Sequence, residues 1–147
     1  MIRVPLIGLL AVLAAVPAFA HPLGNNTVNR QATLHIAAQG IELDYLVDQA
    51  EIPTLVQTQD ADVDGDGTTT AAEWDAYAER WALDAARRLT VEVNGKTVPL
   101  TLQNAGWKLV PGAADLFTLR LQAHYRVADA ASSMTVAYSD ANRLHDL

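Results

Sequence analysis

The chain of 147 residues contains no cysteine, only two phenylalanines, and 10 basic against 17 acidic side chains. Without cysteine the protein has no disulfide, no thiolate metal ligand and no thiol nucleophile. Its formal net charge of −7 makes binding to nucleic acid or to anionic lipid unfavourable. We therefore expect the fold to be stabilised by packing, with a bound ion as a further contributor.

Long apolar runs are also scarce. The run at residues 6–16 covers 11 residues, whereas a helix that crosses a bilayer needs roughly 20. It follows the basic Arg3 and precedes a small-x-small motif at residues 18–20, an order typical of secretory signal peptides. We therefore expect residues 1–20 to be a signal peptide, and residues 21–147 to form one exported domain that begins at His21.

Apolar and polar residues alternate with a period of two through six segments, which is typical of strands that bury one face. The expected strands are residues 31–38, 40–48, 89–93, 96–100, 117–127 and 134–139, with a short addition at 107–110. Gln39 and Gly40 form a turn signal between the first two segments, so these two strands are predicted to form a hairpin.

A second hairpin is predicted at Asn94-Gly95, because this dipeptide favours two-residue turns in which both positions have positive φ. That turn pairs Val93 with Lys96, Val91 with Val98, and Leu89 with Leu100, and it places the apolar residues on one face. Pro99 has no N–H to donate to a neighbouring strand, so its strand is expected at the edge of a sheet.

Helical spacing replaces this alternation from Ala71 to about Arg88. The apolar positions of that stripe are Trp74, Tyr77, Ala78, Trp81, Ala85 and Leu89. A shorter helix is expected from Pro53 to Gln59, since proline is favoured at the first helical position. The fold class we predict is mainly β: an antiparallel, immunoglobulin-like β-sandwich with a helix–loop–helix inserted at about residues 50–88.

The loop between the expected helices reads DVDGDGTTTAAE and fits the calcium loop of an EF-hand, D-x-[DN]-x-[DN]-G-x5-E. The expected calcium ligands are Asp62, Asp64, Asp66, the carbonyl of Thr68, Thr70 and a bidentate Glu73. A register that starts at Asp60 places Ala71 at position twelve. Only the start at Asp62 supplies both the glycine at position six and the carboxylate at position twelve.

Two features indicate weak binding. Position eight, which usually carries a branched apolar residue, is Thr69, and the sequence contains no second loop of this kind. The expected dissociation constant is on the order of 10⁻⁴ to 10⁻³ M, as in extracellular modules. The alternative is a solvated turn before a helix capped by Thr70 and Glu73, but a capping box explains only the glutamate and not three alternating aspartates.

His21 is a second candidate metal site, and the alternative is that it merely begins the mature chain. An amino-terminal histidine chelates nickel or copper through its amine and its ring nitrogen. The remaining histidines, His35, His124 and His145, have no spacing that nominates a partner. His35 and His124 are on the polar faces of their strands, where we expect them to be simply exposed.

Five stretches carry a resemblance to a known family: HPLGNNTVNR, YLVDQAEIPT, DVDGDG, PGAADLFTLRLQAHY and YSDANR. With them the chain resembles the periplasmic amino-terminal domain of bacterial nickel/cobalt transporter-like membrane proteins. The resemblance implies a sensory or ion-handling periplasmic domain in front of a metal-export unit of several membrane helices. It supplies no catalytic residues.

The function we expect is that of a non-enzymatic, calcium-binding accessory or sensor domain whose partners are a divalent metal ion and a membrane transporter. The 147 residues do not include the membrane part, so the chain is expected to be either a fragment of such a protein or a free-standing calcium-binding or metal-carrier protein of the periplasm. An enzyme is not expected, because the serines are in no elbow-type motif and the paired carboxylates are those assigned to the ion.

Overall fold

The computed structural model describes residues 25–128 and 133–142. The expected signal peptide, its cleavage site, His21 and His145 lie outside these residues. Within them the fold is mainly β, as predicted. The large sheet has the order β1-β2-β6-β5 and contains β1 (Val28–Ala37), β2 (Gly40–Gln49), β5 (Thr101–Pro111) and β6 (Phe117–Ala128). The small sheet has the order β4-β3-β7 and contains β3 (Leu89–Val93), β4 (Lys96–Val98) and β7 (Val136–Asp140).

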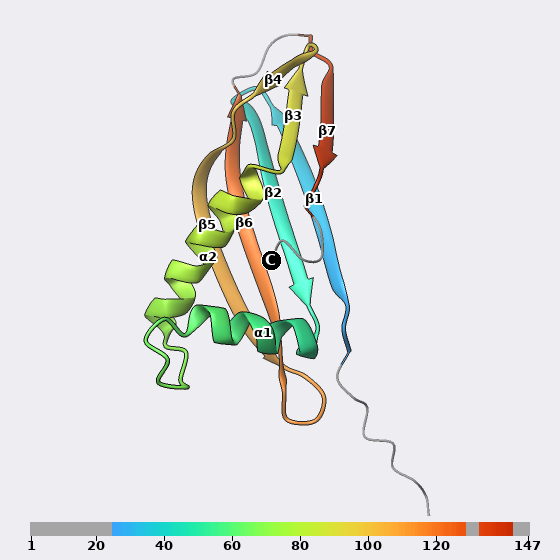
Figure 1. The fold of residues 1–147 in the computed structure, drawn as a ribbon. Helices are drawn as coiled ribbons and strands as arrows, with labels where there is room; N and C mark the ends of the chain where they lie inside the picture. The colour runs from blue at the N-terminus through green and yellow to red at the C-terminus, as the bar shows by residue number, and fades with distance from the viewer. Residues whose placement is uncertain (1–24, 129–132, 143–147) are drawn as a thin grey trace, which may run out of the picture.

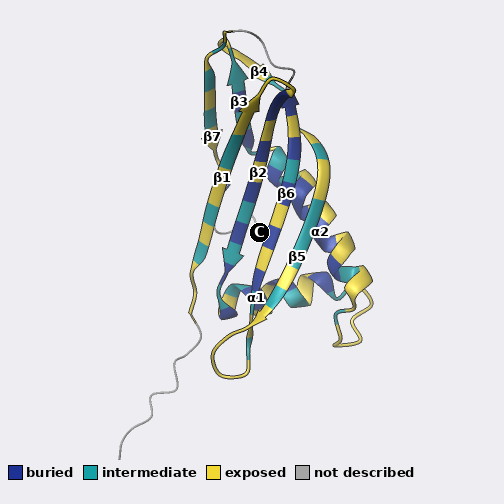
Figure 2. Cartoon of the chain, turned by 180° about the vertical axis from the view of Figure 1, so that it is seen from behind, coloured by how far each residue is buried: buried dark blue, intermediate teal, exposed yellow. Residues whose placement is uncertain are grey.

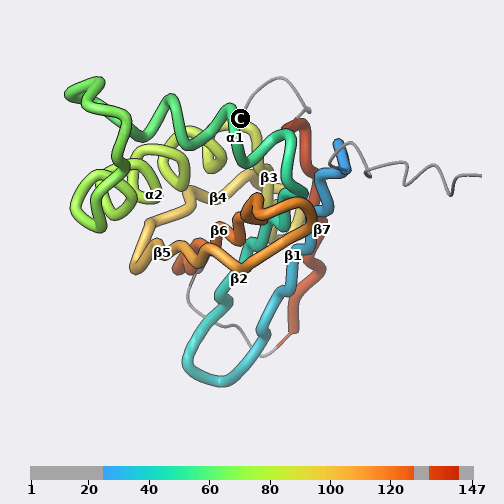
Figure 3. The backbone as a smooth tube through the Cα atoms, turned by 90° about the horizontal axis from the view of Figure 1, so that it is seen from below, coloured from blue at the N-terminus to red at the C-terminus, as the bar shows by residue number. Residues whose placement is uncertain are grey.

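Two helices, α1 (Glu51–Ala61) and α2 (Ala71–Ala86), come between β2 and β3 in the chain. Both lie on one face of the large sheet (Figure 1, Figure 3). The small sheet approaches the same face, because the hydroxyl of Tyr45 on β2 donates a 2.8 Å hydrogen bond to Asp140 on β7. The opposite face of the large sheet is open to solvent (Figure 2).

The predicted alternation is confirmed most clearly on β2 and β6, the two central strands of the large sheet. The buried residues of these strands are Ile41, Leu43, Tyr45, Val47, Leu119, Leu121, Ala123, Tyr125 and Val127. The residues between them point to the open face, which gives the banded pattern along both strands (Figure 2). Period-two patterning therefore sets which face of the sheet carries the core.

The hairpin at Asn94-Gly95 forms with the predicted turn. Both residues have positive φ, 51° and 73°, and Val93 pairs with Lys96 and Val91 with Val98. The predicted pair of Leu89 with Leu100 is wrong, because β4 ends before Pro99 and the partner of Leu89 is Asp140 on β7. Strand β4 is at the edge of its sheet, as a following proline without an N–H requires.

The first hairpin is present, but its turn is displaced by one residue. The two turn positions are Ala38 and Gln39, and Gly40 is already the first residue of β2, paired with Ala37. Its φ of 144° is a value that glycine adopts readily and other residues rarely do. Near the other end of the chain, β7 covers Val136–Asp140, against the expected 134–139.

Strand β5 is much longer than expected. The sequence predicted residues 107–110, whereas β5 extends over Thr101–Pro111 and pairs with β6 along its whole length. The register shifts between Leu102 and Asn104, which is an irregularity of the bulge type. This shift, followed by Gly106 in the middle of the strand, interrupts the alternation that would reveal the strand.

Helix α2 buries the predicted aromatic stripe, with Trp74, Tyr77 and Trp81 almost wholly inside. Trp81 stacks on Tyr45 of β2 at 6.1 Å between ring centroids. Trp74 is 1% exposed and stacks on Trp107 of β5 at 5.6 Å. The assignment of Leu89 to this stripe is wrong, because the helix ends at Ala86 and Leu89 begins β3.

Helix α1 begins two residues earlier than predicted, so Pro53 is its third residue. Proline is tolerated there because the first N–H groups of a helix have no partner within it. The neighbouring Ile52 N–H instead donates a 3.2 Å bond to the Asn25 carbonyl. The buried Glu51 carboxylate accepts bonds from the N–H groups of Asn25 (3.1 Å) and Ala113 (2.8 Å), and it thereby joins α1 to the β5–β6 turn.

Replacing Glu51 by glutamine is expected to flatten the acid limb of the stability curve. The Ala113 N–H, then the N–H of Glu51 itself and that of Asn25, hold the pKa of this carboxyl below its usual 4.5. A lowered folded-state pKa adds stability above the unfolded pKa, and this stability is lost as the pH falls through the folded value. Urea unfolding between neutral and acidic pH measures the effect; equal pH slopes for Glu51→Gln and the parent would contradict it.

Candidate metal centre

The acidic loop, residues 62–73, connects α1 to α2. Asp62 follows the last residue of α1 and donates its N–H to the Thr58 carbonyl at 3.1 Å. Thr70 caps α2: its hydroxyl accepts the Glu73 N–H at 3.3 Å, and Glu73 in turn accepts the Thr70 N–H at 2.8 Å. The predicted capping box is therefore confirmed, and both ends of the loop are fixed by the helices.

The loop brings together the three predicted aspartate ligands. One carboxylate oxygen each from Asp62, Asp64 and Asp66 lies within 4.8 Å of the others. Three carboxylates so close repel one another unless a cation lies between them. Among the residues that the structure describes, no other group of three such side chains meets this distance.

The turn that produces this convergence depends on hydrogen bonds to Asp62. Its two carboxylate oxygens each accept a 2.9 Å bond, one from the Gly65 N–H and one from the Gly67 N–H. Gly67 has a φ of 84°, which side chains with a Cβ rarely adopt. This is the sharp turn predicted at position six of the loop.

Glu73 contacts the loop from the other side, without joining the three aspartates. Its Oε1 accepts the Val63 N–H at 2.9 Å, and its Oε2 accepts both the N–H and the hydroxyl of Thr70 at 2.8 Å. These bonds, led by the one from the Thr70 N–H, lower the pKa of Glu73. Glu73 is thus anionic near neutral pH and adjacent to the loop, and its two oxygens accept hydrogen bonds from the Val63 and Thr70 N–H groups and from the Thr70 hydroxyl.

The next two loop residues bond to different parts of the structure, one to the aspartate turn and the other to α1. The Thr68 N–H donates to Asp66 at 2.7 Å. Thr69, at position eight, donates its hydroxyl to the Thr58 carbonyl of α1 at 3.1 Å. This position, which in paired hands joins a partner loop, is here used within the same helix–loop–helix. The oxygen-only donor set fits Ca²⁺, a hard cation that takes six to eight such ligands.

A second group of ligand-type side chains was missed by the sequence analysis. His35 Nε2 lies 2.8 Å from Asp44 Oδ2, and His124 Nδ1 lies 2.7 Å from Asp44 Oδ1. His35 is exposed, as expected, whereas His124 is half-buried, and the two histidines share one carboxylate. Strand pairing places them there, since Asp44 lies opposite His124 and His35 opposite Glu42. The predicted hairpin made β1 and β2 neighbours, but no pattern in the sequence indicated that β6 pairs with β2 and brings His124 to Asp44.

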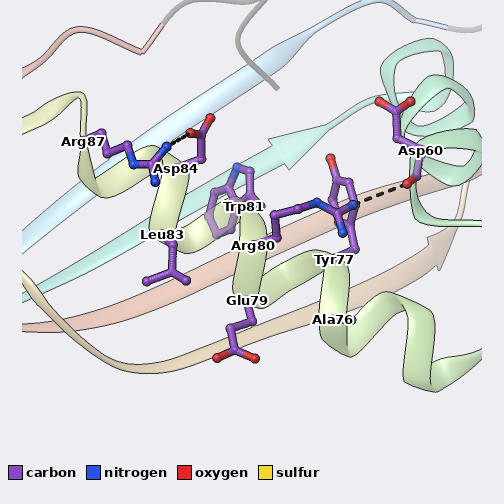
Figure 4. Close-up of a pocket in the computed structure, with 9 residues that line it drawn as sticks. All are labelled: Asp60, Ala76, Tyr77, Glu79, Arg80, Trp81, Leu83, Asp84 and Arg87. Atoms are coloured by element: carbon purple, nitrogen blue, oxygen red, sulfur yellow. Dashed lines mark hydrogen bonds and ion pairs between the residues drawn. The ribbon is translucent and has the colours of Figure 1, made fainter. Parts of the chain in front are cut away.

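A hollow of about 830 Å³ lies along the outer side of α2 and reaches Asp60 (Figure 4). Both arginines that line it have partners nearby. Arg80 lies 5.2 Å from the centre of the Tyr77 ring and donates a 3.4 Å bond to the Asp60 carbonyl, and Arg87 pairs with Asp84 at 3.3 Å. The hollow is open to solvent.

None of the helices that the structure describes combines the length and the apolar character needed to cross a bilayer. Comparisons with known protein families, with curated proteins and with solved structures returned no match. Among the described residues, the acidic loop is the candidate functional site with the clearest geometry.

Proposed function

We propose that this protein is an exported, non-enzymatic calcium-binding domain, in which one EF-hand-type loop braces two helices against a β-sandwich. The observation that carries the proposal is the convergence of Asp62, Asp64 and Asp66 within 4.8 Å around a turn at Gly67. The Thr68 carbonyl, Thr70 and Glu73 complete the proposed ligand set. No catalytic step is included, because the carboxylates suited to acid–base chemistry are those assigned to the ion.

The ion would act mainly through the loop's charge. A divalent cation offsets the mutual repulsion of the aspartates and draws the end of α1 towards the start of α2. Helix α2 carries Trp74 and Trp81 into the core. An ion that orders the loop would therefore also stabilise the packing of this helix on the large sheet. This is the role of a brace, in which binding energy contributes directly to the free energy of folding.

We further propose that the domain serves a divalent-metal transporter of the nickel/cobalt type in the periplasm. The resemblance described above supports this assignment, and His21, once exposed as a new amino terminus, would offer a nickel or copper ligand. The second candidate is a free-standing calcium-binding or metal-carrier protein. Sequencing of the gene beyond codon 147 discriminates between them, since a run of membrane helices in the same frame supports the transporter and a stop codon supports the free protein.

Calcium is expected to raise the melting temperature of the protein. With a dissociation constant on the order of 10⁻⁴ to 10⁻³ M, about 1 mM calcium stabilises the fold by roughly 0.4–1.4 kcal/mol, which corresponds to roughly 2–6 °C. Thermal melts in calcium and in chelator, with calorimetric titration, measure this. Magnesium is the control, because it dehydrates reluctantly and demands a stricter geometry; equal melts in calcium and chelator, with no heat of binding, would overturn the proposal.

A further inference from the structure

The open face of the large sheet carries a cluster that the proposed calcium site does not use. It consists of His35 on β1, Asp44 on β2 and His124 on β6, and we call it the imidazole–carboxylate cluster. The three strands are neighbours, and the face that carries the cluster is the one turned to the viewer in Figure 2. Glu42 stands beside it, with its Oε2 3.8 Å from His124 Nε2.

The cluster differs from a charged pair further along β2 and β6. Asp48, four residues further along β2, is held by two bonds of 2.7 and 2.8 Å to the guanidinium of Arg120. That pair uses a permanent cation, whose protons satisfy the carboxylate. Asp44 instead contacts two imidazoles, at 2.8 and 2.7 Å. A neutral imidazole has one unprotonated ring nitrogen and can change tautomer, so a metal ion can replace the proton on the nitrogen that faces Asp44 while the other ring nitrogen becomes protonated.

We propose that the imidazole–carboxylate cluster binds a divalent transition-metal ion such as Ni²⁺ or Zn²⁺. Imidazole nitrogen together with carboxylate oxygen is a donor set that these ions prefer and that calcium does not. The site is separate from the acidic loop and from His21. It gives the domain one surface for the hard ion that braces it and another for a softer ion.

The geometry requires only small movements of exposed side chains. Ligands held about 2.0–2.1 Å from a tetrahedral ion are separated by about 3.3 Å, so each N···O distance must widen by about half an ångström. The histidines touch opposite oxygens of Asp44, and the three ligand atoms do not all lie within 4.8 Å. One ring must therefore turn towards the other, and the His35 side chain, 51% exposed, is free to do so.

The surroundings favour a cation. Two acidic side chains stand at the cluster, since Asp44 contacts both imidazoles and Glu42 Oε2 lies 3.8 Å from His124 Nε2. A hollow of about 420 Å³ lies beside Asp44 and His124 and is lined in part by the polar side chains of Gln31, Asn104 and Gln122. It leaves room for the water or further ligand that an open coordination site retains.

The test uses the untagged chain with His21→Ala, so that amino-terminal chelation is absent, in enough calcium to occupy the acidic loop. Ni²⁺ and Zn²⁺ are titrated calorimetrically, and Co²⁺ is added as a spectroscopic probe because its visible bands report nitrogen ligation and geometry. The variants are His35→Gln, His124→Gln and Asp44→Asn. The matched control is Asp48→Asn, a carboxylate on the same strand and face that pairs with arginine. Circular dichroism checks that each variant is folded.

We expect saturable binding by the His21→Ala chain, a loss of affinity of roughly tenfold or more in each cluster variant, and no change in Asp48→Asn. Absence of binding by the folded His21→Ala chain would overturn the inference. So would equal affinity in the parent and in the double variant His35→Gln/His124→Gln. Because calcium is present throughout, failure here leaves the proposal for the acidic loop intact, and failure of calcium binding does not affect this result.

Discussion

Replacement of Trp74 by alanine is expected to lower the free energy of unfolding by about 3–5 kcal/mol. The indole is 1% exposed, and it lies between Tyr77, edge-on at 5.7 Å, and Trp107, stacked at 5.6 Å. Alanine removes both ring contacts and leaves a cavity that the rigid pair of α2 and β5 cannot close. Chemical denaturation in the absence of calcium, followed by circular dichroism, measures the change.

Leu83→Ala is the matched control on the same helix. Leu83 is 51% exposed, so its truncation is expected to change stability by less than about 0.5 kcal/mol. A Trp74→Phe variant should fall between the two, because it retains one aromatic ring at the contact. A loss of less than about 1 kcal/mol in Trp74→Ala would mean that α2 is not fixed to the sheet through this residue.

Calcium affinity is expected to fall by roughly tenfold or more, or about 1.4 kcal/mol, when Asp62 is replaced by alanine. Asp62 is both a proposed ligand and the acceptor of the two N–H bonds that form the turn, from Gly65 and Gly67. Its loss therefore removes a negative charge and also the geometry that brings Asp64 and Asp66 close. Calorimetric titration of calcium, with melts in chelator as a reference, measures the effect.

Asp60→Ala separates a specific ligand from the general charge of the region. Asp60 is in the last turn of α1, and its carbonyl, rather than its carboxylate, receives the bond from Arg80. Both variants remove one negative charge from the same helix–loop–helix. Equal losses of calcium affinity in Asp60→Ala and Asp62→Ala would show that the ion is held by diffuse attraction and not in the predicted register.

The parts of the fold that the sequence predicted are those in which local patterning and burial agree. Every second residue is buried along β2 from Ile41 and along β6 from Leu119 to Val127, so both strands were found from their alternation. Only residues 107–110 of β5 were predicted, because the register shift near Asn104 and the glycine at 106 interrupt the pattern of the rest of the strand. The turn at Asn94-Gly95 needed only its own backbone preference, whereas β4 ends at Val98, before Pro99, and so stops short of the predicted pair between Leu89 and Leu100.

The two candidate metal sites also differ in how far their residues could be predicted from local sequence. The acidic loop is contiguous in sequence, so its ligands could be assigned from their spacing before any fold was known. The imidazole–carboxylate cluster joins residues that are 9 and 80 positions apart. Its assembly depends on β2 pairing with β6 along one edge and with β1 along the other edge. No single sequence carries that strand order in its periodicity.

The hydrogen bond from Thr69 to the Thr58 carbonyl has a consequence for how the domain responds to its surroundings. In paired EF-hands, occupation of one loop alters its neighbour and produces a steep, threshold-like response. Here the residue that would couple two loops is tied to its own helix. Calcium occupancy would then follow a simple hyperbola. The stiffness of α2 would therefore change gradually with the external calcium concentration, without a threshold.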